Sequence, residues 1–212
     1  MSGILVAGGA IAALFASTVS AGSAPAAAEA PPEGVRVGIE TVNGSGCPAG
    51  TVGVSLSPDR GSFTVNYSEY LARVGAGADP TGFRKNCQLV LNIGSPAGWT
   101  YAVSGLDHSG YAHLERGATG EQNSAYYFQG SSGTTSVSHD FTGPYDDEWQ
   151  TSDSASMGEL VWAPCGEQRF LNVNTELRVD AGSSDAEHSV SFLAMRSTDV
   201  PATTYHLTWK RC

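Results

Sequence analysis

Alternation of apolar and polar residues is the feature that most restricts what this chain can fold into. After residue 34, short runs with every second residue apolar follow one another, separated by clusters of Gly, Pro, Asn, Asp and Ser. A period of two places successive side chains on opposite faces of a β-strand, whereas an amphipathic helix needs a period near 3.6. None of the runs has the helical period. The sequence therefore predicts an all-β protein whose strands each bury one face.

Two alternating runs near the start predict a hairpin. Val52, Val54 and Leu56 lie on one side of the first run, and residues 63–67 repeat the pattern after the turn SPDRG. Later runs of the same kind cover residues 87–93, 171–179, 190–194 and 205–209. We interpret residues 68–82 as a crossover loop, because glycines interrupt the segment. So many short strands and turns predict a two-sheet antiparallel β-sandwich of the jelly-roll type, with a closed barrel as the alternative.

The first 28 residues predict a secretory signal peptide. They carry no charge and contain an apolar stretch from Ile4 to Phe15, followed by small residues that allow cleavage after Ala21 or Ala28. The positive charge that usually opens such a peptide is missing. The apolar stretch is too short to span a bilayer, which needs roughly 20 residues, so we expect no membrane anchor. We expect a flexible arm over residues 29–34 and a single β-sandwich domain over residues 35–212.

The charge balance argues against two classes of partner. The chain has 11 Lys and Arg against 21 Asp and Glu, which gives a net charge of -10. Nucleic acids and anionic membranes are bound by clustered cations, and this chain lacks such clusters. We therefore expect neither as a partner, and we expect an acidic, secreted monomer.

The four cysteines, Cys47, Cys87, Cys165 and Cys212, predict two disulfides in an oxidising compartment. Three pairings are possible. We favour Cys47 with Cys87 and Cys165 with Cys212, because each pair closes one half of the chain. Each such loop contributes about 4 kcal/mol in the chain-entropy account. Zinc is the other common use of four cysteines, but the sequence has no C-x-x-C or H-x-x-x-H spacing.

Several motifs occur together in this chain: an NGSGCP turn leading into SLSPD, then KNCQL, then PCGEQRFLNVNTELRV, and a last strand that ends in WKRC. This set resembles the secreted domain-of-unknown-function family 4360, found in filamentous bacteria and fungi. The resemblance covers the chain from about Val35 to Cys212. It implies an extracellular β-protein with a signal peptide and paired cysteines. It implies no activity and no catalytic or binding residue.

The segment LDHSGYAHLERG, residues 106–117, is the best candidate for a catalytic cluster. In a strand, Asp107, Tyr111, His113 and Glu115 share one face, while the other face carries Leu106, His108, Ala112 and Leu114. A histidine between carboxylates can act as a general base or a metal ligand. The alternative, which we favour, is a solvated polar face opposite a core face, because the spacing supplies no nucleophile and no third metal ligand.

The run PYDDEWQTSD, residues 144–153, is the best candidate for a metal site. It places Asp146, Asp147, Glu148 and Asp153 in what we interpret as a short loop. Clustered carboxylate oxygens are the ligands that Ca²⁺ prefers, but the order of an EF-hand loop is absent. We favour an acidic surface turn without a cofactor and keep a structural calcium ion as the alternative.

Aromatic and amide side chains suggest a binding surface. Trp99 and Tyr101 share a face, as do Tyr126 and Phe128, and such rings usually fill the core of a sandwich. Trp149, inside the acidic run, is the ring that we expect to be exposed. Asn172 and Asn174 lie on a polar strand face that continues through Glu176 and Arg178.

From these features we expect a non-enzymatic module that binds a polysaccharide or other cell-surface material, with Trp149, Asn172 and Asn174 in contact with the ligand. One alternative is a secreted hydrolase or lyase acting on polysaccharide, with Asp107, His113 and Glu115 at its active site. A second alternative is an extracellular inhibitor or matrix protein. The G-x-S-x-G pentapeptide of serine hydrolases does not occur in the sequence.

Overall fold

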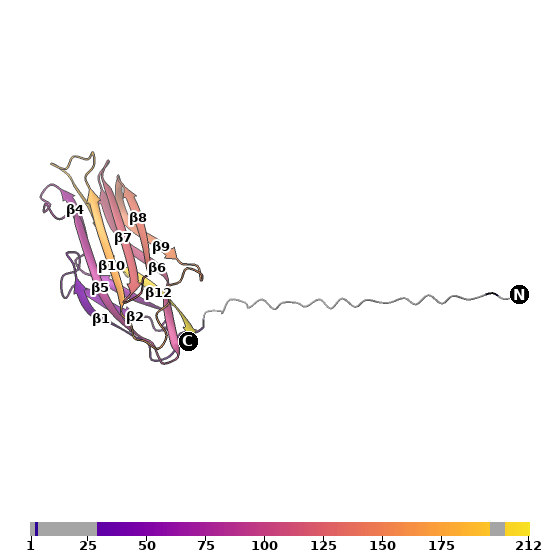
Figure 1. Ribbon diagram of the computed structural model, residues 1–212. Coiled ribbons are helices and arrows are strands. Elements are labelled where there is room, and N and C mark those ends of the chain that lie inside the picture. The colour runs from indigo at the N-terminus through magenta and orange to yellow at the C-terminus, as the bar shows by residue number, and fades with distance from the viewer. Residues whose placement is uncertain (1–2, 4–28, 196–201) are drawn as a thin grey trace.

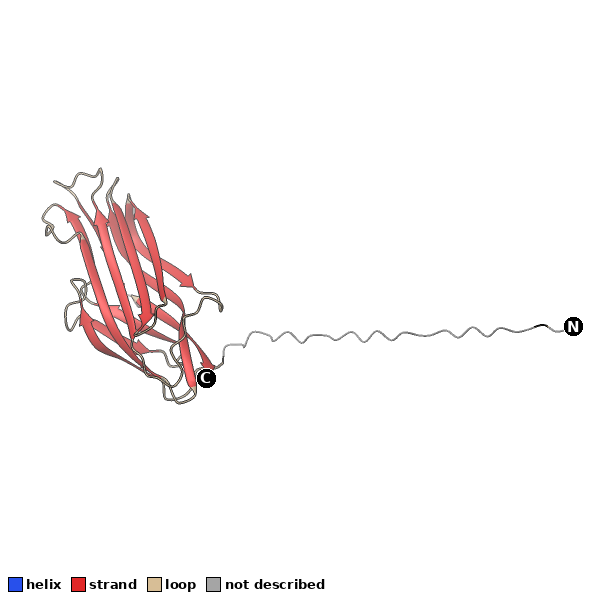
Figure 2. Ribbon diagram, in the orientation of Figure 1, coloured by secondary structure: helices blue, strands red, loops and turns tan. Residues whose placement is uncertain are grey.

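The computed structural model describes residue 3 and residues 29–195 and 202–212, and within these ranges the protein contains strands and no helix (Figure 2). The all-β prediction is confirmed. Apart from residue 3, the predicted signal peptide lies outside the described residues. The described strands are β1 (Arg36–Asn43), β2 (Val52–Leu56), β3 (Ser62–Tyr67), β4 (Leu71–Gly75), β5 (Arg84–Gly94), β6 (Trp99–Leu114), β7 (Thr119–Phe128), β8 (Thr134–Thr142), β9 (Tyr145–Ser154), β10 (Leu171–Asp180), β11 (Val190–Ala194) and β12 (Thr203–Arg211).

The strands form two antiparallel sheets that enclose one core (Figure 1). The five-stranded sheet has the order β1-β5-β10-β7-β8. The seven-stranded sheet has the order β2-β3-β12-β6-β11-β4, and β9 pairs with β6. Strand β6 is long enough to pair with β12 along its first part, with β11 near its end, and with β9 along its other edge. The predicted β-sandwich is therefore confirmed.

The predicted hairpin is present. Strands β2 and β3 pair from Val52 with Tyr67 to Leu56 with Phe63. In the turn, the Asp59 carboxylate accepts hydrogen bonds from the Ser57 hydroxyl and the Gly61 backbone N–H. The runs predicted at residues 87–93, 171–179, 190–194 and 205–209 all lie in strands. In residues 190–194, however, the inward positions are Ser191 and Leu193, so the apolar Phe192 faces outward instead of into the core.

The interpretation of residues 68–82 as a crossover loop is wrong in part. Leu71–Gly75 form β4, an edge strand that pairs with β11. Ala72 and Val74 face the core side while Arg73 lies on the opposite face, so this short run alternates like the longer ones. The glycines that suggested a loop end the strand instead, and Gly75 adopts a φ of 103°.

The interpretation of residues 144–153 as a surface loop is also wrong, as is the expected exposure of Trp149. Residues Tyr145–Ser154 form β9, and Trp149 is only 3% exposed. Its indole packs against Phe141, and across the strand pair it lies opposite Gly110. A Cβ at Gly110 would approach the Trp149 ring to 2.5 Å, so this glycine makes the space that the indole occupies. Charges on the remaining positions of β9 suit an edge strand.

Two disulfides hold the ends of the domain, with the predicted pairing. Cys47 is bonded to Cys87, and Cys165 to Cys212. The segment 29–34, expected to be a flexible arm, contacts the last strand: the Glu29 N–H donates to the Trp209 carbonyl, and Pro32 is buried. The described residues include no helix long and apolar enough to cross a membrane.

Candidate functional site

The outer face of the five-stranded sheet is covered by amide and hydroxyl side chains. In one row across the strands, Gln88 of β5 lies beside Asn174 of β10, which is followed by Ala125 of β7 and Ser136 of β8. Two neighbouring rows repeat the arrangement: Asn86, Glu176, Asn123 and Ser138 form one, and Val90, Asn172, Tyr127 and Thr134 the other. We call this surface, defined by these three rows, the amide face.

The middle of the amide face is hollowed into an open groove of about 450 Å³. Its walls come from β5, β10, β7 and β8. Ala125 accounts for part of the depth. Its methyl group is shorter than the side chains of Asn174, its neighbour on β10, and of Asn123, two residues earlier on β7. Residues such as Thr175 and Ser124 also line the groove, although strand alternation directs their side chains into the core.

Several side chains of the amide face keep their hydrogen-bonding capacity. Within the part of the chain that the structure describes, Gln88, Asn172, Asn174 and Ser136 make no side-chain hydrogen bond. Each amide has two N–H donors and an acceptor oxygen. Neighbouring strands lie about 4.8 Å apart, so these donors and acceptors recur at a regular spacing across the sheet. The face can therefore hydrogen-bond a ligand that carries many neutral polar groups.

Charge is confined to one end of the amide face and is largely compensated there. The Glu176 carboxylate contacts the guanidinium groups of Arg84 and Arg178. The hydrogen bond from Arg84 lowers the pKa of Glu176; burial opposes this, and Arg178 adds to it. The centre of the face, around Asn174 and Ala125, is thus uncharged in a protein whose net charge is -10.

The outer face of the seven-stranded sheet has a different character, and it contains the predicted catalytic candidates. Asp107 accepts a hydrogen bond from the Ser152 hydroxyl at 2.7 Å and contacts His206 Nε2 at 2.5 Å. Partial burial raises the pKa of Asp107, but the hydrogen bonds from His206 and Ser152 outweigh it and the pKa is lowered. In a catalytic triad the serine contacts the histidine, whereas here both contact the carboxylate.

His113 belongs to a separate cluster. Its Nδ1 lies 2.9 Å from Asp146 Oδ1, and the Tyr111 hydroxyl donates to the same oxygen at 2.8 Å. His113 Nε2 lies 3.7 Å from the Glu115 carboxylate, and Phe192 of β11 stacks against both the Tyr111 and His113 rings. The hydrogen bonds from His113 and then Tyr111 lower the pKa of Asp146.

The predicted catalytic set is therefore divided. His113 and Glu115 are neighbours, but Asp107 is six residues from His113 on the same strand, which is roughly 20 Å. Asp107, Asp146 and Glu176 all have lowered pKa values, whereas a glycosidase needs one carboxylic acid that stays protonated.

The predicted metal candidates are distributed over both faces of β9. Asp146 and Glu148 lie on the outer face, while Asp147 follows the alternate side of the strand with Trp149. Asp153 contacts His139 of β8 at 2.8 Å. Among the described residues, no three His, Cys, Asp or Glu side chains are grouped as a metal site.

Asn172, Asn174 and Glu176 lie on the amide face, but its members from β5, β7 and β8 were not predicted. Gln88 occupies a polar position of the alternating run 87–93, and Tyr127 lies opposite the buried pair Tyr126 and Phe128, so their direction was readable from the sequence. The cross-strand neighbours of each residue cannot be predicted from the sequence in this way, because they depend on which strands pair. The same holds for His206 and Ser152, which meet Asp107 from β12 and β9.

Comparisons with known proteins place the chain in a family. It matches the Domain of unknown function (DUF4360) over residues 33–212. It is 37% identical over 182 residues to an "Uncharacterized secreted protein" of Arthroderma benhamiae, covering 85% of this chain and 73% of the relative. Like that relative, it is a secreted protein.

Among solved structures, the chain is similar to the enzymatically active domain of tailspike protein 4 of bacteriophage CBA120. The match covers 81% of this chain and 19% of the tailspike chain, with 12% sequence identity. Its TM-score of 0.26 is too low for this similarity to bear on fold or function. The family match and the similarity to the fungal relative together show that the chain belongs to the DUF4360 family.

Proposed function

We propose that this protein is a secreted carbohydrate-binding module that holds a polysaccharide chain on its amide face. The observation that carries the proposal is the groove of about 450 Å³, where Gln88, Asn174 and Ser136 keep their donors and acceptors. Its charged lining residues, Arg84 and Glu176, are paired with each other at one end. A polysaccharide presents neutral hydroxyl groups at a regular repeat. An array of amides that recurs from strand to strand is suited to such a ligand, because each neutral hydrogen bond adds modestly and the sum gives affinity.

Tyr127 adds an aromatic group to this surface. It is half-buried and lies between Asn172 and Thr134 on the row next to the centre of the groove. An aromatic ring offers apolar contact to the C–H face of a sugar at a low cost in side-chain entropy. It takes the place that the sequence suggested for Trp149, whose indole is in the core.

The test is a pull-down of the purified secreted protein with insoluble chitin, cellulose, peptidoglycan and β-glucan, beside an assay for released reducing sugar. Wild type should bind at least one of these polymers without releasing sugar. The double variant Gln88→Ala/Asn174→Ala should lose that binding. Gln150→Ala is the matched control, because Gln150 is an exposed amide on the outer face of the other sheet, and its binding should equal that of wild type.

Two results would contradict the proposal. One is the absence of binding to all four polymers; the other is binding that survives the double variant. Release of reducing sugar would instead favour a hydrolase, and the candidate residues His113, Glu115 and Asp107 would then be substituted one at a time.

A further inference from the structure

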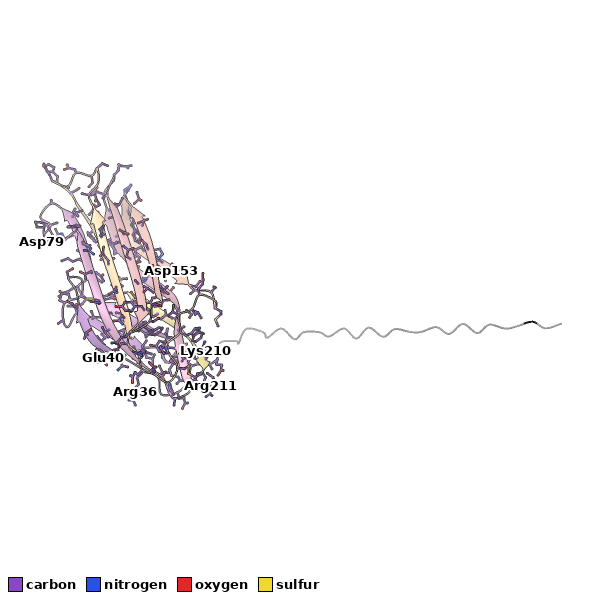
Figure 3. The ribbon with its side chains drawn as sticks, viewed as in Figure 1. Arg36, Glu40, Asp79, Asp153, Lys210 and Arg211 are labelled. Carbon is purple, nitrogen blue, oxygen red and sulfur yellow. A yellow bond between two sulfur atoms is a disulfide. The ribbon has the colours of Figure 1, made fainter. Side chains whose placement is uncertain are left out.

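A second cavity lies at the end of the sandwich where β5 passes into β6. It has a volume of about 340 Å³, and none of the described residues lines both this cavity and the groove of the amide face. Its walls come from the loop at residues 94–98 and from residues 163–169, which lead into β10. Figure 3 places Arg36 and Arg211 at this end of the molecule and Asp79 at the opposite end. We call it the end cavity.

The walls of the end cavity are fixed by covalent and hydrogen bonds. The Thr100 hydroxyl donates to the Ala163 carbonyl at 2.6 Å, which ties one wall to β6. The disulfide between Cys165 and Cys212 ties the same wall to the last strand, and the Cys212 N–H donates to the Gly98 carbonyl of the other wall. A cavity held in this way needs little ordering when a ligand enters, which favours affinity.

Trp99 forms one side of the end cavity. The Arg211 guanidinium lies 4.2 Å from the centre of its ring, a cation–π contact that holds the indole in place. Arg211 is not among the residues that line the cavity, so this contact orients the ring without filling the space. An indole fixed at the edge of a cavity provides an apolar surface for a flat or ring-shaped ligand.

Tyr101 closes the inner wall of the cavity. The residue is only 2% exposed, and its ring packs against Phe128 and Trp209 of the core. Its hydroxyl oxygen is itself buried, so it lies behind the wall and does not reach a ligand in the cavity. The inner wall is therefore an aromatic surface that is fixed by the core.

The remaining polar groups lie at the rim. Gln168 donates through its amide to Asn92 and keeps its own carbonyl oxygen as an acceptor. Arg169 and Glu167 contact one another through two nitrogens of the guanidinium, so their charges are compensated. The cavity thus combines a fixed indole, an aromatic inner wall and a neutral polar rim.

We propose that the end cavity is a separate binding site for one saccharide ring, with Trp99 against the C–H face of the sugar and the Gln168 carbonyl oxygen accepting a hydrogen bond from one of its hydroxyls. A sugar ring has one face of C–H groups and a periphery of hydroxyls, and this cavity offers the matching surfaces at a volume typical of small-ligand sites. The proposal does not depend on the amide face. The ligand class is a monosaccharide, a disaccharide or the terminal unit of a glycan.

The test is a titration of the secreted protein with glucose, galactose, N-acetylglucosamine and their β-linked disaccharides, followed by tryptophan fluorescence and by ligand-observed saturation-transfer NMR. At least one sugar should bind saturably and change the fluorescence. Trp99→Leu should abolish both signals. Trp162→Leu is the matched control, because Trp162 stacks with Lys210 outside the cavity, and binding should persist in it.

Gln168→Ala removes the rim acceptor and leaves Trp99 in place. We expect a three- to tenfold loss of affinity, about the value of one neutral hydrogen bond, with little change of stability in urea because Gln168 is exposed. Gln88→Ala/Asn174→Ala should leave sugar binding in the end cavity intact, so failure of this site and failure of the amide face are separable. The inference is overturned if none of the sugars binds, or if binding is unchanged in Trp99→Leu or Gln168→Ala.

Discussion

The two outer faces of this sandwich are both polar, but they use their polar groups differently. On the seven-stranded sheet, Asp107 and Asp146 are each bonded to a histidine and a hydroxyl, so the acceptors are occupied by neighbours. On the five-stranded sheet, Gln88, Asn172 and Asn174 have no such partner in the described chain. A face whose groups satisfy one another contributes to local order, while a face with spare donors and acceptors is available to a ligand.

The difference shows why residue type alone is a poor guide to a site. His113 between carboxylates has the composition of a catalytic centre, yet Asp146, Tyr111 and Phe192 already surround it. Asparagine is less suggestive in a sequence, because it is common on exposed strands. Side by side on three strands and next to Ala125, however, amides form a groove that can bind a ligand.

The largest expected effect concerns the disulfide at the border of the amide face. Cys47 and Cys87 close a loop with a sequence separation of 40 residues, and Ser45, two residues before Cys47, donates to Asn86 of the amide face. Cys47→Ala/Cys87→Ala should lower the free energy of unfolding by about 4 kcal/mol, because the unfolded chain gains conformational freedom. Urea denaturation measures this loss of stability. The same double variant should also weaken polysaccharide binding, whereas removing Cys165 and Cys212 should affect the end cavity first. Unchanged stability would contradict the role assigned to this bond.

The second effect separates the core histidine from those on the outer face. His108 is fully buried, and burial lowers its pKa from 6.5 to about 4, opposed in part by Asp153. Between these two values the unfolded chain binds a proton that the folded protein excludes. The stability present above pH 6.5 is therefore lost as the pH falls toward 4. The shift corresponds to about 3 kcal/mol.

Urea denaturation as a function of pH measures this loss. In His108→Gln, the free energy of unfolding should fall by about 3 kcal/mol less than in wild type between pH 6.5 and pH 4. The other titrating groups contribute equally to both proteins. Gln150→Ala, a substitution of a non-titrating residue on the outer face, is the control and should retain the wild-type dependence. If His108→Gln and wild type lose stability in parallel, His108 is not the group responsible.

The third prediction tests the comparison of the two faces directly through their aromatic residues. Tyr127→Ala on the amide face should weaken polysaccharide binding about tenfold, roughly 1.4 kcal/mol, as expected for an aromatic contact residue. Phe192→Ala removes a half-buried ring from the other outer face and should leave the affinity unchanged. Depletion isotherms with the polymer bound by wild type supply both values. The reverse order of effects would move the binding site to the seven-stranded sheet.

Much of this fold follows from period two in the sequence. The hairpin of β2 and β3 and the strands around Cys87, Asn174 and Tyr205 are predictable, because alternation fixes which side chains face the core. The favoured disulfide pairing has another basis, the even number of cysteines and the position of each pair in one half of the chain. Strand β9 was missed because its charges suggest a loop, whereas an edge strand tolerates them and the space above Gly110 receives Trp149.

The site was less predictable than the fold for a physical reason. Alternation tells that Asn172 and Asn174 point outward, but their neighbours Tyr127 and Ala125 come from a strand more than 40 residues earlier in the chain. Cross-strand neighbours depend on strand order and register, and a local pattern carries neither. The division of Asp107 from His113 has a similar origin, since two residues on one strand face remain apart by the length of strand between them.

The smallest expected effect tests whether the groups of the seven-stranded sheet satisfy one another. The pKa of Asp146 is lowered first by His113 and then by Tyr111, and that of Tyr111 is raised by Asp146. Tyr111→Phe removes one of the two donors, so the pKa of Asp146 should rise toward its ordinary value while remaining below it. Carboxyl-detected NMR titration follows this shift. Because Asp146 is exposed, no change in the urea midpoint is expected. If the pKa of Asp146 did not move, the Tyr111 hydroxyl would be free in solution, and the contrast between an occupied face and an available one would lose one of its supports.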